Sequence, residues 1–308
     1  MLEINEVYPQ IYLLRVPVPL DIKYINAYLF TGEVPTLIDA GCKGADFCAE
    51  IRDTLRHLGI PRLKQIFLSH WHVDHGGGAA ALAAAEGAEI FITARDYAEW
   101  IKFSRPERFD DLQDYMFHSW GVPEQEIRQM SKFYTYLQGI DESPEAVSYI
   151  EPGVQLEAGN YRLQVLGTPG HTPGHVSFVL AEAGLLFGGD HLLPNQIPYP
   201  AVWVDGGKLE SGMPSYLKSL DVVAAAGCSR YFPAHGAPAM DPTARCQEVA
   251  GQMREQIANH VPADTVYLGA VPLLNGRSEF LFYDLHIVFG WEEMQRLSAG
   301  RNPWRRSE

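Results

Sequence analysis

Short apolar runs broken by glycine, proline or a polar residue recur along the chain. The runs at 11–16, 26–31, 36–39, 63–68 and 89–92 have the length and composition of buried strands, and the segments at 44–57 and 79–85 have helical character. Strand signals return at 154–156, 161–166, 176–180 and 185–190 and once more near 231–233, before a helix predicted at 243–259. This order of elements predicts a layered structure of strands and helices.

The pattern changes between residues 96 and 150, where Tyr, Trp, Phe and Met recur at helical spacing. Breaks at Pro106 and at 121–123 divide this segment into about three helices. We interpret it as a helical cap insertion that supplies an apolar wall for a substrate; the alternative is that its helices only pack on the main body. His118 lies in this segment and is a candidate substrate-facing residue.

Metal-binding side chains follow several of the predicted strands. Residues 69–78 read SHWHVDHGGG, residues 168–175 read TPGHTPGH, and a Gly-Gly-Asp and a His-Gly end two later strands. The candidate ligands are His70, His72, Asp74, His75, His171, Asp190 and His235. Loops at strand ends commonly carry chemistry, and imidazole and carboxylate groups suit Zn, with Fe or Mn as alternatives.

These motifs resemble the signatures of the metallo-β-lactamase-fold hydrolase superfamily. The HxHxDH signature stands at 70–75, and the match extends over residues 5–240. The resemblance implies an α+β fold, the four-layer αββα metallo-β-lactamase sandwich, with a dinuclear centre of two Zn²⁺ per chain. It further implies that one ion is bound by His70, His72 and His171, that the other is bound by Asp74, His75 and His235, and that Asp190 bridges both.

Two such ions would share a water and lower its pKa, and the metal-bridging hydroxide would attack a carbonyl or phosphoryl centre. We expect Asp74 to orient it and accept its proton, so Asp74 and Asp190 are the predicted catalytic carboxylates. Residues 189–194, GDHLLP, resemble a bacterial hydrolase subgroup whose relatives include acyl-carrier or CoA-type thioesterases and a small endoribonuclease. Leu193 stands where related lactonases have Tyr, which weighs against a lactone.

The predicted function is therefore hydrolysis of a thioester, ester or lactone carbonyl. The alternatives are an iron-dependent persulfide dioxygenase of the same fold and an endoribonuclease-type phosphodiesterase. Aromatic residues Trp71, Tyr199 and Trp203 are expected to contact an acyl substrate. Three further residues, Asp39, His175 and His191, are expected to support the ligands through hydrogen bonds. Asp39 is equally a candidate cap for the helix near residue 44, and His191 is also a candidate to face the substrate.

The composition of the chain limits which classes of partner are expected. The 24 basic and 38 acidic residues give a net charge of −14, which disfavours a nucleic-acid partner. No leader or membrane-length apolar run is recognised, and the four Cys lack paired spacing, so we expect a cytoplasmic enzyme with no membrane partner and with reduced, buried thiols. Its expected partner is a small acyl-type molecule, with a homodimer left open. The expected domains are a catalytic domain at 1–240, including the cap at 96–150, and a helical extension at 241–308, with a winged-helix-like module as the alternative.

Overall fold

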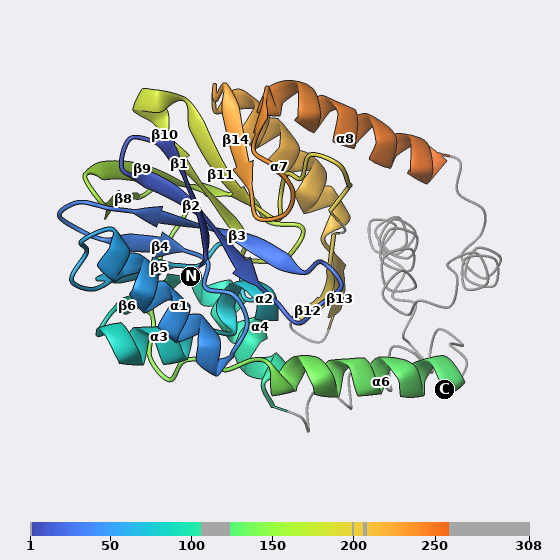
Figure 1. The fold of residues 1–308 in the computed structure, drawn as a ribbon. Coiled ribbons are helices and arrows are strands. Elements are labelled where there is room, and N and C mark those ends of the chain that lie inside the picture. Colours follow the sequence, from blue (N-terminus) through green and yellow to red (C-terminus); the bar gives the residue numbers. More distant parts are fainter. Residues whose placement is uncertain (1, 106–123, 199, 206–207, 259–308) are drawn as a thin grey trace.

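The computed structural model describes residues 2–105, 124–198, 200–205 and 208–258. Over these residues the chain forms two large sheets, with helices on the outer faces (Figure 1). His118, Tyr199 and residues 259–308 lie outside the described residues. The extension predicted at 241–308 is therefore described only in its first part, which is helical as expected, and the winged-helix alternative stays a prediction.

The first sheet has seven strands in sequence order. They are β1 (Glu3–Tyr8), β2 (Ile11–Pro17), β3 (Tyr24–Phe30), β4 (Thr36–Ile38), β5 (Gln65–Phe67), β6 (Glu89–Ile92) and β7 (Ser148–Tyr149). Pairing is antiparallel from β1 to β4 and parallel from β4 to β7. Because β4, β5 and β6 run parallel, their carboxyl ends meet at one edge of the sheet, and each connection between them must cross back to the opposite edge.

Helices make these crossovers. They are α1 (Ala45–His57) after β4, α2 (Val73–Gly76) and α3 (Ala79–Glu86) after β5, and α4 (Ala94–Phe103) and α6 (Glu124–Gly139) after β6. In Figure 1, α1 and α3 lie on the outer side of the first sheet, and α6 runs along the lower side of the molecule.

The second sheet has six strands in the order β15-β14-β11-β10-β9-β8. Its strands are β8 (Gln155–Ala158), β9 (Tyr161–Gly167), β10 (Val176–Leu180), β11 (Leu185–Gly189), β14 (Arg230–Pro233) and β15 (Ala239–Met240). The 3₁₀ turn Ala181–Ala183 joins β10 to β11. Strands β12 (Val202–Asp205) and β13 (Lys208–Ser211) form a separate two-stranded sheet, and helices α7 (Met213–Ala225) and α8 (Pro242–Ala258) pack together on the outer side.

Three apolar layers separate the four layers of structure. The layer between the sheets contains Tyr28, Phe30, Phe67, Phe178, Phe187 and Phe232. The layer under α1 and α3 contains Leu29, Leu37, Ile51, Leu55, Ile66 and Leu82. The layer under α7 and α8 contains Val179, Leu186, Tyr216, Leu220, Val249 and Met253. Since successive side chains of a strand point to opposite faces, Tyr28 and Phe30 enter one layer and Leu29 the other.

The expected α+β, four-layer αββα fold is thereby confirmed. Both ends of the segment at 96–150, which was expected to be a cap insertion, are part of the main fold. Helix α4 buries Trp100 and Phe103 in the core beneath the first sheet, and residues 148–149 form β7, which pairs with β6. Within the described residues, no helix is long and apolar enough to cross a membrane.

Candidate metal centre

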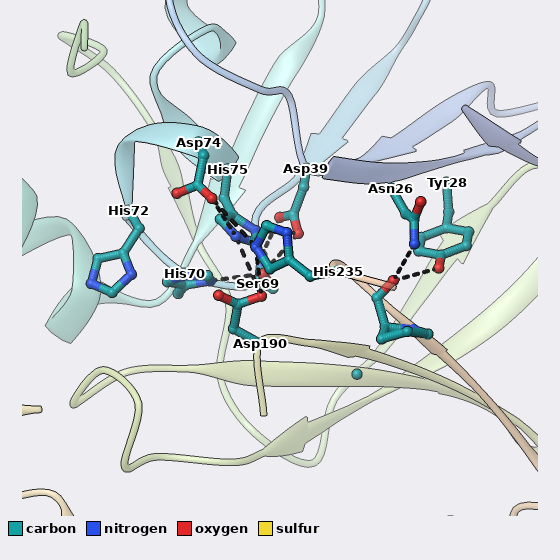
Figure 2. Close-up of polar contacts among 12 residues, drawn as sticks. Asn26, Tyr28, Asp39, Ser69, His70, His72, Asp74, His75, Asp190 and His235 are labelled. Atoms are coloured by element: carbon teal, nitrogen blue, oxygen red, sulfur yellow. Dashed lines mark hydrogen bonds and ion pairs between the residues drawn. The ribbon is translucent and has the colours of Figure 1, made fainter. Parts of the chain in front are cut away.

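Seven side chains from four loops converge at the carboxyl ends of the strands. His70 and His72 follow β5, Asp74 and His75 lie in α2, His171 lies between β9 and β10, and Asp190 and His235 follow β11 and β14. The ligand atoms of three groups lie within 4.8 Å of one another: His70 with His72 and His171, His70 with His75 and Asp190, and Asp74 with His75 and His235. The structure therefore brings all seven predicted ligands into one cluster. Figure 2 shows this cluster with every ligand labelled except His171.

Asp190 lies between the two outer groups. Its Oδ2 is 3.4 Å from Nε2 of His171, whereas its Oδ1 is 3.2 Å from Nε2 of His235 and 3.5 Å from Nε2 of His75. One carboxylate oxygen thus faces each histidine group, which is the arrangement that a bridging ligand needs.

The donor atoms fit divalent cations. Among the described residues, Nε2 of His70 and Nε2 of His75 are buried without a hydrogen-bond partner. Nε2 of His171 lies 3.0 Å from Nδ1 of His72. Neighbouring ligand atoms in a tetrahedral zinc site lie about 3.4 Å apart, because Zn–N bonds are about 2.0–2.1 Å long. The buried lone pairs and these spacings suit metal coordination better than hydrogen bonding within the protein.

Burial and charge divide the histidines into two sets. Burial lowers the pKa of His72 to about 3 and holds the pKa of His70 well below its ordinary value, so both rings are neutral. Burial opposes protonation of His235 as well, but Asp190 and Asp74 raise its pKa to about 10. In turn, the pKa of Asp74 is about 2, because the positive charges of His75 and His235 outweigh its burial. A divalent cation would take the place of these protons, so we expect metal binding to release them.

Asp39 orients two of the histidines. Nδ1 of His75 donates to Oδ2 of Asp39 at 2.9 Å, and Ser69 donates its backbone N–H and its hydroxyl to the same carboxylate at 2.9 Å each. Because the Ser69 hydroxyl donates to Asp39, it accepts from Nδ1 of His70 at 3.0 Å. His70 therefore presents the lone pair of Nε2 to the cluster, and His75 does so once its second proton is released on metal binding.

Asp39 hydrogen-bonds to the loop of the candidate ligands and is not the residue that precedes the next helix. The residue preceding α1 is Gly44, which makes no side-chain cap. Asp39 also has a φ of 61°, a conformation that residues with side chains rarely adopt and that is often retained at functional sites.

His175 holds Asp190 from the second sheet. The backbone N–H of Asp190 donates to Nε2 of His175 at 3.2 Å, so Nδ1 carries the proton and donates to Thr168 at 2.8 Å. A Cβ on Gly189, whose φ is 53°, would lie 2.8 Å from Nε2 of His175. A residue with a side chain at position 189 would therefore collide with His175, which explains why glycine precedes Asp190.

His191 is fully buried. Its ring lies 4.6 Å from the ring of Tyr216 and 6.0 Å from that of His175. Burial lowers the pKa of His191 to about 3. The ring therefore faces the layer under α7 rather than a solvent-accessible substrate.

Aromatic side chains connect the cluster to the cap helices. The Trp71 ring is 4.8 Å from the ring of His72 and 5.1 Å from that of Phe103 in α4, and Phe103 is 6.5 Å from Tyr134 in α6. Trp203, in β12, is buried and lies beneath the guanidinium of Arg95 at 5.7 Å. Trp71 is thus the predicted substrate-binding residue that the structure places directly against a candidate ligand.

Three polar residues at the site were not predicted. Nδ2 of Asn26 and the hydroxyl of Tyr28, both in β3, donate to the carbonyl of Pro233 at 3.0 and 2.7 Å (Figure 2). Asp96 accepts hydrogen bonds from two ligand loops. A polar residue within an apolar strand was a usable signal for Asn26, but Asp96 gives no such signal, because acidic residues are common in the first turn of a helix.

Comparison with known proteins gives a consistent family. A sequence model described as the metallo-beta-lactamase superfamily matches residues 20–235. The crystal structure of a metallo-beta-lactamase family protein, TTHA1429 from Thermus thermophilus, has a TM-score of 0.79 and 27% identity, covering 94% of this chain and 95% of that one.

Two curated relatives are similar over most of this chain. The probable metallo-hydrolase YqjP of Bacillus subtilis is 26% identical over 73% of this chain and 71% of its own length. An atrochrysone carboxyl ACP thioesterase of Passalora fulva is 26% identical over 69% of this chain but only 48% of its own length. Family match, fold and relatives agree: the chain belongs to the metallo-beta-lactamase superfamily of metal-dependent hydrolases.

Proposed function

We propose that this protein is a dinuclear metal-dependent hydrolase that cleaves an acyl thioester, ester or lactone. The position of Asp190, with one oxygen toward His171 and the other toward His235, carries this proposal. Structural zinc sites are closed by four protein ligands, whereas seven donors shared between two ions leave positions for water and substrate. The number of histidines favours Zn, with Fe or Mn as alternatives.

Divalent cations held by these side chains would supply an activated water and polarise a carbonyl oxygen. The chain's own contribution begins with Asp74, which lies with His75 and His235 in one candidate metal group and whose carboxylate is ionised at neutral pH. An ionised carboxylate can orient the attacking water by accepting a hydrogen bond from it. Asp39, through His75 and Ser69, keeps the imidazoles in the tautomer that leaves Nε2 free for coordination.

Aromatic contacts favour an acyl substrate. Trp71 joins the candidate ligand His72 to Phe103 and so offers an apolar surface beside the reacting centre. The net charge of −14 disfavours an RNA substrate. The similarity to an acyl-carrier-protein thioesterase supports a thioester, which we place first among the three acyl classes.

The metal content of the purified protein tests the proposal directly. Asp190→Ala is compared with the parent and with Asp53→Ala, which changes an exposed carboxylate in α1. We expect close to two Zn per chain in the parent and the control, and a marked loss in Asp190→Ala. A single Fe per chain, or two ions in all three proteins, would contradict the dinuclear site that Asp190 bridges.

Substrate class is tested with the metal-loaded parent protein on a panel of acyl thioesters, esters and lactones, with RNA and a persulfide added. We expect turnover on the acyl substrates, highest on thioesters. Cleavage of RNA alone, or oxygen uptake with the persulfide alone, would overturn the acyl assignment and leave the metal assignment standing.

A further inference from the structure

Asp96 is a buried carboxylate that none of the sequence motifs includes. It lies in the first turn of α4, directly after β6, and its side chain is fully inaccessible to solvent. An acidic residue at this position of a helix ordinarily folds back onto the helix's own first turn. The Asp96 carboxylate instead accepts hydrogen bonds from two other loops.

Both oxygens of Asp96 are used by these loops. Oδ2 accepts from the backbone N–H of Trp71 at 3.1 Å and from the hydroxyl of Thr172 at 2.8 Å, and Oδ1 accepts from the backbone N–H of Gly174 at 2.6 Å. Trp71 lies between His70 and His72, and Thr172 follows His171. One carboxylate therefore connects the two loops that carry the three histidines of the first candidate metal group.

The packing around Asp96 leaves little freedom. Thr93, the N-cap of α4, donates its hydroxyl to the carbonyl of Gly174 at 2.8 Å and accepts from the backbone N–H of Asp96. A Cβ on Gly174 would lie 2.3 Å from Oγ1 of Thr93 and 2.7 Å from Oδ1 of Asp96. The start of α4 and the His171 loop are thus in direct contact, with Asp96 and Thr93 as their polar links.

We propose that Asp96 is a positioning residue that fixes the loop of His70 and His72 relative to the loop of His171. This inference rests on the proposed metal function. All three groups that reach the Asp96 side chain are donors, so an asparagine, with one acceptor and one NH₂ group, cannot satisfy all of them. Burial raises the pKa of Asp96 to about 7, against the effect of Thr172, Gly174 and Trp71 as donors.

Asp141 provides a matched control. It is also a buried carboxylate next to α4, but its oxygens accept from Nε1 of Trp100 at 3.0 and 2.9 Å and from Ser104, not from a ligand loop. Asp141→Asn therefore removes a comparable buried charge from the same region. Thr172→Val is a milder variant that removes one of the three donors and leaves Asp96 in place.

The test is a titration of each metal-stripped protein with Co²⁺, followed by its visible absorption and by competition with a chromophoric chelator. We expect the parent and Asp141→Asn to bind two ions. In Asp96→Asn we expect the ion at His70, His72 and His171 to bind about 10–100-fold more weakly, with an altered spectrum, and in Thr172→Val a smaller shift in the same direction.

Each other outcome has a distinct meaning. Parent-like affinity and spectrum in Asp96→Asn would overturn the positioning role. Equal weakening in Asp96→Asn and Asp141→Asn would also overturn it, because it would reflect stability of α4 alone. If Asp96→Asn does not fold, unchanged binding in Thr172→Val refutes the proposal and weakened binding supports it. A parent protein that binds no metal would instead refute the proposed function.

Discussion

Replacement of Asp39 by asparagine separates its charge from its backbone conformation. Asparagine tolerates the φ of 61° better than most residues with a side chain, so the fold is preserved. The amide, however, offers one acceptor where the carboxylate receives three hydrogen bonds, two from Ser69 and one from His75. With Oδ1 kept for the Ser69 N–H, the NH₂ group would face His75 and drive its proton to Nε2.

A proton on Nε2 of His75 competes directly with a cation at that atom. Loss of an outer partner of a metal-binding histidine typically costs about 10–100-fold in metal affinity, or about 1.4–2.7 kcal/mol. We therefore expect Asp39→Asn to fold and to bind its metal ions more weakly by that factor. Asp39→Ala should in addition be less stable, since a left-handed backbone costs most residues about 1–2 kcal/mol.

The assay is competition for Zn²⁺ between the protein and a chromophoric chelator, with a thermal melt in excess EDTA to compare the folds. Ser69→Ala is the matched control, because it removes the partner of His70 and leaves the His75–Asp39 hydrogen bond intact. We expect its loss of affinity to be smaller than that of Asp39→Asn. Two ions bound by Asp39→Asn with the parent's affinity would refute the role assigned to Asp39.

Two further predictions concern the substrate wall and the pH dependence of stability. Trp71→Ala should raise KM for long-chain acyl substrates by about 10–100-fold, because it removes an aromatic contact that the bound substrate would bury. Metal content and KM for short-chain substrates should be unchanged. An equal rise in KM for both chain lengths would contradict an acyl-binding wall. Burial raises the pKa of Asp141 from 3.8 to about 6. The unfolded chain therefore ionises at lower pH than the folded protein, and stability is full below about pH 4 and lost as pH rises through 6. Denaturant titrations of the metal-free proteins should show the parent losing about 3 kcal/mol relative to Asp141→Asn between pH 4 and 7, and parallel pH profiles would refute the effect.

The convergence of the candidate ligands could be predicted because each of these residues lies in a short motif directly after a strand. A strand followed by a histidine or aspartate, with glycine before or after it, recurs at His70, His171, Asp190 and His235, and the carboxyl ends of the strands bring these residues together. The central strands were also predictable, since strands buried on both faces appear as continuous apolar runs. The order of the strands in the sheets could not be predicted from the sequence. The choice between the two roles open to Asp39, as a helix cap or as a hydrogen-bond partner of the candidate ligands, also required the structure.

Other elements were missed for different reasons. Helix α7 had a recognisable signal, with Met213, Tyr216, Leu220 and Val223 on one face and Pro214 near its start. By contrast, β7 and β15 have two residues each, and such strands exist only through pairing with a neighbour. No local pattern indicates that the Asp96 carboxylate reaches two distant loops, because this depends on where β6 ends relative to β5 and β9.

The polar residues that support the candidate ligands also set the position of one sheet relative to the other. Asp96, after the first sheet's β6, holds the His171 loop of the second sheet, and Asn26 and Tyr28 of β3 bind backbone carbonyls that flank His235. The apolar layer between the sheets cannot fix their relative position alone, since hydrophobic contacts are not directional. Hydrogen bonds are directional, and these lie at the edge where displacement of one sheet would separate the ligand groups that Asp190 spans. Because each candidate ion would be bound by residues from both sheets, we expect the precision of the site to depend on residues such as Asp96 and Asn26 as much as on the candidate ligands themselves.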